Sequence, residues 1–296
     1  MKEIVVLSGK GGVGKSSLTA ALGHLLAEGG RRITLADTDV DAPNLHIVLG
    51  AEFDSSSGVT ASNKAVIDYD RCSRCLKCAE VCKFASIIGG EEPVVISYSC
   101  EGCGACAIVC PTGAITVQPV ENGRINLVRH GSIRVVAGEL GIGESSSGRL
   151  VDFVKKRARQ EAALSGCSLL LTDGPPGIGC PVIASLKGSD YAVLVTEPTP
   201  SAFSDLQRAA EVLRGFKVPA GVVINRADMH QKSKETLLAW MAEAGLPLLA
   251  EIPYDPQLPQ ALAQGCLGVV IYPDAPSSLA IRQLSETVAA MLDDGH

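Results

Sequence analysis

The chain has 296 residues, with 26 lysines and arginines against 32 aspartates and glutamates, which gives a formal net charge of −6. With 46% hydrophobic and 20% charged residues, its composition is that of a globular protein and excludes a largely disordered one. The acidic balance argues against a general nucleic-acid-binding protein, because phosphate contacts require a basic surface. Neither a signal-peptide pattern nor an apolar run of about 20 residues is present, so we expect a cytoplasmic protein without a membrane span.

The cysteines are clustered in one stretch of the chain. The sequence has 11 cysteines, and eight of them fall between Cys72 and Cys110. A secreted disulfide framework is typically a short chain with a signal peptide, which does not fit this sequence. We therefore expect thiols that bind metal.

Outside this stretch, short apolar runs alternate with longer amphipathic segments. Near-continuous apolar runs are typical of parallel strands covered on both faces, and the amphipathic segments predict helices between them. This alternation predicts a doubly wound α/β domain with a mostly parallel sheet. The predicted strands are 2–8, 31–36, 132–138, 168–173, 191–196, 220–225 and 247–253, and the predicted helices are 16–28, 148–164, 201–214, 231–244 and 277–292.

An internal repeat interrupts this pattern between Asn63 and Gln118. Its first four cysteines recur 28 residues later, and the flanks keep the same offset. Two equivalent half-units predict a small α+β domain with pseudo-two-fold symmetry, inserted at 63–118 between 1–62 and 119–296. The alternating segment 117–129 contains Asn122-Gly123 and predicts a hairpin that leads the chain back to the sheet.

A phosphate-binding pattern stands at the first strand-to-helix turn. GKGGVGKS, from Gly9 to Ser16, satisfies G-x-x-x-x-G-K-[ST]. Its glycines let backbone N–H groups surround an anion at the positive end of the following helix. Lys15 would bridge the β- and γ-phosphates of ATP, and the Ser16 hydroxyl would bind Mg²⁺. A plain glycine-rich turn is the alternative. The predicted loop comprises Gly9, Lys10, Gly11, Gly12, Val13, Gly14, Lys15, Ser16 and Ser17.

The segment KGGVGKSS resembles the deviant Walker A motif of the MinD/ParA class of ATPases, which includes the nitrogenase iron protein. The resemblance implies that Lys10 reaches across an interface to a partner's nucleotide. It therefore implies an ATP-dependent homodimer, or a heterodimer with a similar ATPase. The alternative for Lys10 is a solvated lysine.

Three further regions resemble the same class in the same order. In ADTDVDAPNL (36–45), Asp39 matches the residue that orients or deprotonates the attacking water, while Asp37 and Asp41 could be solvated or capping carboxylates. In LLLTDGPPG (169–177), Asp173 matches the carboxylate that lies near Mg²⁺ in this class. The resemblance thus assigns Ser16, Asp39 and Asp173 to the Mg²⁺ site. The adenine-binding positions of the class fall on Asn225, Arg226, Pro253 and Tyr254.

The cysteine stretch contains the run C-x2-C-x2-C-x3-C twice, and the second copy ends in Cys110-Pro111. This is the bacterial ferredoxin run, in which the fourth cysteine ligates the cluster of the other motif. In the first copy Lys83 stands where proline usually follows. Two zinc sites are the main alternative. The predicted 4Fe-4S ligand sets are Cys72, Cys75, Cys78 and Cys110 for the first cluster, and Cys82, Cys100, Cys103 and Cys106 for the second.

Three cysteines lie outside these motifs. Cys180 follows Asp173 where the nitrogenase iron protein has a cluster ligand, but the position of its other ligand falls on Glu144. We expect Cys180 to be a buried structural thiol, with a labile ligand in the dimer as the alternative. Cys167 and Cys266 are expected to be structural.

The whole chain resembles MinD-superfamily ATPases that carry an inserted ferredoxin-like domain. The resemblance implies an ATP-hydrolysing dimer coupled to iron–sulfur clusters. ATP-gated electron transfer or metallocofactor maturation, with a redox or metallocofactor partner protein, ranks first. The alternative is a nucleotide-dependent partner-recruitment or positioning ATPase of the MinD/ParA type, with the clusters as sensors or cargo. Membrane binding is not expected, because the C-terminal segment LSETVAAMLDDGH is acidic.

Overall fold

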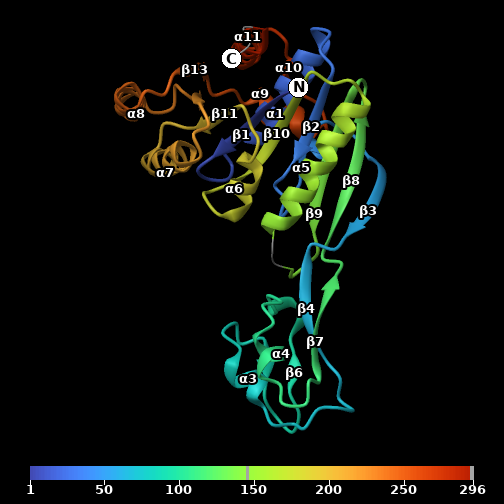
Figure 1. Cartoon of the computed structure of the whole chain (residues 1–296). Helices are drawn as coiled ribbons and strands as arrows, with labels where there is room; N and C mark the ends of the chain where they lie inside the picture. The colour runs from blue at the N-terminus through green and yellow to red at the C-terminus, as the bar shows by residue number, and fades with distance from the viewer. Residues whose placement is uncertain (145–146, 294–296) are drawn as a thin grey trace.

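The structure, a computed structural model, describes residues 1–144 and 147–293. Within them a nine-stranded sheet forms the body of the molecule, and a smaller cysteine-rich segment extends from one end of it (Figure 1). The order of the strands is β13-β12-β11-β1-β10-β2-β9-β8-β3. Their bounds are β1 Lys2–Ser8, β2 Ile33–Asp37, β3 Phe53–Val59, β8 Gly123–His130, β9 Ile133–Leu140, β10 Leu169–Pro176, β11 Tyr191–Thr196, β12 Ala220–Asn225 and β13 Leu248–Ile252.

The sheet is parallel from β13 to β9, whereas β8 is antiparallel to both β9 and the edge strand β3. The seven strands predicted from apolar runs are all present, with ends shifted by a few residues. The register pairs Asp173 of β10 with Val6 of β1 and Asp37 of β2. Two carboxylates on neighbouring strands are therefore brought to the same C-terminal edge.

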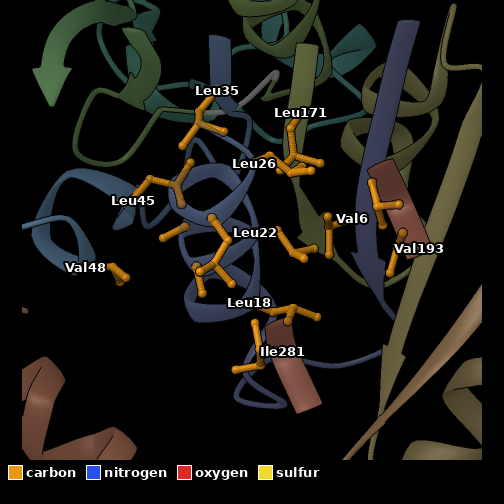
Figure 2. Close-up of a cluster of buried hydrophobic side chains, with 14 of the residues drawn as sticks. Val6, Leu18, Leu22, Leu26, Leu35, Leu45, Val48, Leu171, Val193 and Ile281 are labelled. Atoms are coloured by element: carbon orange, nitrogen blue, oxygen red, sulfur yellow. The ribbon is translucent and has the colours of Figure 1, made fainter. Parts of the chain in front are cut away.

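Helices cover both faces of the sheet. Successive residues of a strand point to opposite faces, so Val6 packs in the cluster with α1 and α11, while Val5 packs with α6, α7 and α8. Figure 2 shows Leu22 of α1 among side chains from several strands. Large-to-small substitution of such a side chain typically costs 2–5 kcal/mol, about a third of a domain's stability. The main helices are α1 Lys15–Glu28, α5 Ser147–Leu164, α6 Cys180–Leu186, α7 Pro200–Phe216, α8 Gln231–Ala244 and α11 Pro276–Asp293.

The five predicted helices are confirmed, and four shorter helices in this body are additional. α6 follows β10, and the others are α2 Leu45–Val48, α9 Gln257–Ala263 and α10 Gly268–Ile271. They lack the length over which hydrophobic periodicity can be recognised. The edge strand β3 was also not predicted, because its sequence, FDSSSGV, is polar and almost wholly exposed.

We call residues 62–120 the cysteine segment. It joins the body through the antiparallel ladder of β4 (Ser62–Ile67) and β7 (Ile115–Val120), and it contains a second ladder of β5 (Ile87–Ile88) and β6 (Val94–Val95). A 3₁₀ turn, η1, spans Ser97–Ser99. Two five-residue helices, α3 Lys77–Val81 and α4 Ala105–Val109, are separated by the 28-residue offset of the sequence repeat. The repeat in sequence is therefore a repeat in structure.

The predicted hairpin over 117–129 is wrong. β7 pairs with β4, whereas β8 pairs with β3 and β9, so the two strands lie in different sheets. A two-residue type I′ turn needs positive φ at both central residues, and neither Asn122 nor Gly123 is among the described positive-φ residues. Instead, Asn122 Oδ1 accepts the N–H of Ala61 at 2.8 Å, and the chain passes from one sheet to the other.

Candidate functional site

The glycine-rich loop lies between β1 and α1 at the C-terminal edge of the parallel strands. Gly12 and Gly14 have φ of 81° and 93°, a left-handed conformation that favours glycine. Asn225 Nδ2 donates to the carbonyl of Val13 at 2.8 Å, and a Cβ atom at Gly14 would lie 2.5 Å from this nitrogen. The loop conformation thus depends on glycine and on a side chain from the end of β12.

Lys15, Asp39 and Asp173 meet beneath this loop. The Nζ atom of Lys15 lies 2.8 Å from Asp173 Oδ1 and 4.0 Å from Asp39 Oδ2. Thr19 Oγ1 also donates to Asp173 Oδ1, at 3.3 Å. Asp173 is completely buried, and its Oδ2 has no hydrogen-bond partner among the described residues. A buried carboxylate oxygen without a donor favours a cation.

This environment changes the acidity of the carboxyl groups of Asp39 and Asp37. Burial raises the pKa of Asp39 to about 6, although the nearby Lys15 lowers it. Burial and the adjacent Asp173 raise the pKa of Asp37 to about 7. Asp37 nevertheless has a structural role, since its Oδ2 accepts the N–H groups of Asn44 and Leu45, both at 2.9 Å. This agrees with the capping alternative for Asp37.

Oxygen ligands of the kind that Mg²⁺ prefers are present at this position. The Ser16 hydroxyl lies 3.5 Å from Lys15 Nζ, the same atom that lies near the carboxylates of Asp39 and Asp173. The chemistry of this donor set and the unpartnered oxygen of Asp173 both fit a hard divalent cation. The residues of the predicted Mg²⁺ site are thus close together.

The predicted adenine-binding residues line a single cavity. Asn225 and Arg226 follow β12, Pro253 and Tyr254 follow β13, and Gly14 reaches the same cavity from the glycine-rich loop. Much of the remaining lining is apolar and comes from α1 and from the region of α9–α11. A flat apolar ring with polar edges fits such a surface. No local sequence motif marks the C-terminal part of this lining.

Lys10 has an ionic partner that sequence reasoning missed. Its Nζ atom lies 2.9 Å from Glu197 Oε1 and donates to Ser201 Oγ at 3.4 Å. Arg226 binds the other carboxylate oxygen of Glu197 at 2.8 Å. Burial raises the pKa of Glu197, but the two cations outweigh this effect and lower it. Lys10 is about one-third exposed, so its side chain is ion-paired and partly solvated.

The eight clustered cysteines form two groups. One hollow in the cysteine segment is lined by Cys72, Cys75, Cys78 and Cys110, and another by Cys82, Cys100, Cys103 and Cys106. We call them the first and second quartets. Each combines three cysteines of one motif with the fourth cysteine of the other, as the ferredoxin run predicts.

Backbone N–H groups point at the sulfurs of both quartets. Ser86 N–H donates to Cys82 Sγ and Ala114 N–H donates to Cys110 Sγ, both at 3.3 Å. Burial raises the pKa of Cys82 and Cys110, but hydrogen bonds to their sulfurs outweigh it and lower both values. Burial raises the pKa of Cys78. N–H donors stabilise thiolates, which are the form that binds iron.

In the described part of the chain the cysteines form neither a disulfide nor a compact group for a single metal ion. All 11 cysteines are free thiols, so none is in a disulfide. Among the described residues, no three His, Cys, Asp or Glu side chains are grouped for one metal ion.

The expectation that Cys180 is buried is wrong. Cys180 is exposed, because it begins α6 at the open C-terminal edge of the sheet. Glu144 is engaged in an ion pair with Lys64 at 2.9 Å. Cys167 is half-buried, with its sulfur 3.2 Å from the Thr34 hydroxyl, and Cys266 is also half-buried.

Residues 4–267 match the model of the CobQ/CobB/MinD/ParA nucleotide binding domain, CbiA. The chain therefore belongs to this family, the MinD/ParA type of P-loop ATPases. The family description names a nucleotide-binding domain and no iron–sulfur cluster. The family match thus supports the nucleotide-dependent switch better than ATP-gated electron transfer, the function that we ranked first from the sequence motifs.

Two relatives come from Methanocaldococcus jannaschii. The uncharacterised protein MJ0578 is 34% identical over 265 residues, covering 90% of this chain and 89% of the relative. The ATP-binding protein MJ0547 is 23% identical over 288 residues, covering 95% of this chain and 85% of the relative.

Two solved structures have the same fold. The septum site-determining protein MinD of Pyrococcus horikoshii, complexed with Mg-ADP, has a TM-score of 0.61 at 20% identity, over 97% of this chain and 95% of that one. The MinC:MinD cell division protein complex of Aquifex aeolicus has a TM-score of 0.60 at 20% identity, over 98% and 96%. None of the helices in the described residues has the length and apolarity to cross a membrane.

Proposed function

We propose that this chain is an ATP-dependent dimeric switch whose cysteine segment holds two 4Fe-4S clusters. The observation that carries the switch is the gathering of Lys15, Asp39 and Asp173 beneath the glycine-rich loop, with Lys10 at its rim. The domain division that goes with this proposal is an ATPase of residues 1–62 and 119–296 and a ferredoxin-like insert of 63–118.

Nucleotide binding would begin with an exchange of partners at Lys15. The Lys15 ammonium is paired with Asp173 at 2.8 Å. The β- and γ-phosphates offer it a stronger anion, so Lys15 moves to them and leaves Asp173 free for a cation held with Ser16 and Asp39. Mg²⁺, when bound, neutralises charge on the phosphates. The MinD structure that contains Mg-ADP supports this ligand, since it shares the fold.

Hydrolysis requires a group that takes the proton of the attacking water. Water adds to the γ-phosphorus, the bond to the β-phosphate oxygen breaks, and the proton passes to Asp39. With a pKa of about 6, Asp39 is mainly ionised at neutral pH and close to the best range for a general base. Lys10 of one subunit would stabilise the charge on the nucleotide of the other subunit.

Switching would act on a partner protein. A solved relative of the same fold is a complex of MinC and MinD, which supports nucleotide-dependent recruitment as the output. In this candidate function the clusters are sensors or cargo. The two quartets favour a second candidate, ATP-gated electron transfer or metallocofactor maturation with a redox or metallocofactor partner. When bound, the clusters would supply one-electron redox chemistry.

Two lysine substitutions test the switch. Lys15→Ala should weaken ATP binding by about 100-fold, because it removes charge-assisted hydrogen bonds to phosphate. Lys10→Ala should keep ATP binding but lose ATP-dependent dimerisation and hydrolysis. Calorimetry, sedimentation and phosphate release measure these effects, and Lys232→Ala, at an exposed lysine of α8, is the control. A Lys10→Ala chain that dimerises and hydrolyses ATP normally would refute the trans role.

The choice between the two outputs needs an anaerobic experiment. Iron and acid-labile sulfide are counted in the purified chain, and partner capture is compared with and without Mg-ATP in iron-loaded and iron-free protein. Nucleotide-dependent capture that survives removal of iron supports recruitment. Capture that requires the clusters, together with an ATP-dependent rate of cluster oxidation, supports electron transfer.

A further inference from the structure

Three consecutive residues of β4 connect the second quartet to the body of the molecule. On the backbone side, Ala65 N–H donates to Cys100 Sγ at 3.4 Å. Gly102, with φ of 61°, lies so close that a Cβ atom there would be 2.2 Å from the carbonyl oxygen of Asn63. Between them, the side chain of Lys64 leaves the ladder and pairs with Glu144 at 2.9 Å.

The Lys64–Glu144 pair is enclosed. The side chain of Lys64 is 3% exposed and that of Glu144 is 18% exposed. Among the described residues, Lys64 Nζ and Glu144 Oε2 have no hydrogen-bond partner beside this ion pair. Separating two such charges would leave both unpaired away from water, so the pair tolerates little displacement.

Residues on either side of Glu144 contact the segment that carries Asp39 and the helix that begins at Cys180. Leu140, at the end of β9, donates its N–H to the carbonyl of Val40 at 2.8 Å, and Val40 directly follows Asp39. Gly148, in the first turn of α5, lies so near α6 that a Cβ atom there would be 3.4 Å from Cys180 Cβ. The described residues on both sides of Glu144 thus contact elements next to the predicted nucleotide site, through Val40 on one side and through α6 on the other.

The first quartet has no equivalent connection among the described residues. Its hollow is lined by Ile115, which pairs with Ile67 at the other end of the β4–β7 ladder. At about 3.3 Å per residue, Ile67 lies some 10 Å along the strand from Lys64. The contacts of β4 thus place the second quartet at the end of the β4–β7 ladder nearer the body and the first quartet at the other end. Figure 1 shows that this ladder extends away from the nine-stranded sheet.

We propose that the Lys64–Glu144 ion pair couples nucleotide binding to the second quartet and not to the first. The inference rests on the proposed function and assigns its regulation to one of two otherwise equivalent sites. Nucleotide-dependent movement near Asp39 and Cys180 shifts Glu144, Glu144 carries Lys64, and β4 carries the loop of Cys100. Lys64 and Glu144 are positioning residues, because neither touches nucleotide or sulfur.

The test compares the two clusters in one molecule. In the anaerobically purified full chain, Mg-ATP should change the EPR signal that Cys103→Ser removes and leave the signal that Cys75→Ser removes. The double variant Lys64→Met/Glu144→Gln leaves no buried charge unpaired, so its stability and iron content should stay near those of the wild type. Its Mg-ATP response should be lost. Arg74→Met, which removes the exposed Arg74–Glu92 ion pair of the same segment, should keep the response.

A second measurement does not need iron. Mg-ATP should change amide hydrogen exchange in β4 of the iron-free chain, and the double variant should abolish this change. The inference is overturned if both EPR signals respond alike, if the double variant responds as the wild type does, or if a chain with full iron and normal ATP affinity shows no response. Iron content and ATP affinity of the same samples report on the proposed function separately, so a failure there is recognised as such.

Discussion

The ammonium of Lys10 lies 2.9 Å from the carboxylate of Glu197, which also binds Arg226 at 2.8 Å. Both cations were predicted to bind nucleotide, one across a dimer interface and one beside the base. Glu197 supplies the anion that each of them binds. The proposed trans role therefore requires Lys10 to leave Glu197 before it can reach a partner's phosphates.

Replacing Glu197 by glutamine should make the dimer form more readily. Glu197→Gln removes the charge that holds Lys10, and a partly exposed ion pair of this kind contributes up to about 1 kcal/mol. The ATP concentration for half-maximal dimerisation, measured by sedimentation, should fall by about two- to fivefold. Ser201→Ala removes only the longer contact with Lys10 and serves as the control. If dimerisation of Glu197→Gln instead requires more ATP, Glu197 stabilises the dimer and does not compete with its formation.

The rate of ATP hydrolysis should depend on pH through Asp39. Burial raises its pKa to about 6, so the carboxylate that accepts a proton is lost as the pH falls through this value. The turnover rate at saturating ATP should be level above about pH 7 and should fall about tenfold per unit well below pH 6. Asp39→Asn should be slow at every pH, whereas Asp54→Asn, at an exposed position of β3, should keep the wild-type profile. An unchanged profile in Asp39→Asn would assign the titration to another group.

The body of the fold could be predicted from the sequence because buried parallel strands are continuous apolar runs. The polar edge strand β3 and the short helices have no such pattern, and the chain at Asn122-Gly123 resembles a hairpin although its two strands join different sheets. The grouping of Lys15, Asp39 and Asp173 was predictable from motifs at strand ends. The pairs Lys10–Glu197 and Lys64–Glu144 join residues far apart in the chain, and only the packed structure brings them together.

The two halves of the cysteine segment should differ in backbone strain. Arg74, Leu76 and Ala85 have φ between 50° and 58°, whereas the residues 28 positions later are Gly102, Gly104 and Gly113. A non-glycine residue in this conformation costs about 1–2 kcal/mol. Gly113→Ala should therefore lower the free energy of unfolding by about that amount. Ala85→Gly should raise it by less than 1 kcal/mol, because glycine also loses more entropy on folding. Denaturation of iron-free protein measures the free energy of unfolding of both variants. A Gly113→Ala variant with a higher free energy of unfolding would contradict the difference in backbone strain between the two halves.

Replacing the fourth cysteine of one motif by serine should remove the cluster that the other motif holds. Cys82 lines the hollow with Cys100, Cys103 and Cys106, and Cys110 lines the hollow of the first motif. Cys82→Ser should thus halve the iron content and leave the cluster held by Cys72, Cys75 and Cys78, and Cys110→Ser should do the reverse. Serine substitution of Cys72, Cys75 or Cys78, the other cysteines of the first motif, removes the EPR signal of the first quartet. Comparison with these variants shows which signal survives in Cys82→Ser. Cys266→Ser, outside both quartets, should keep full iron. If Cys82→Ser destroys the cluster of its own motif, each run of four cysteines holds its own metal and the crossed arrangement of the two quartets is not the one that binds iron.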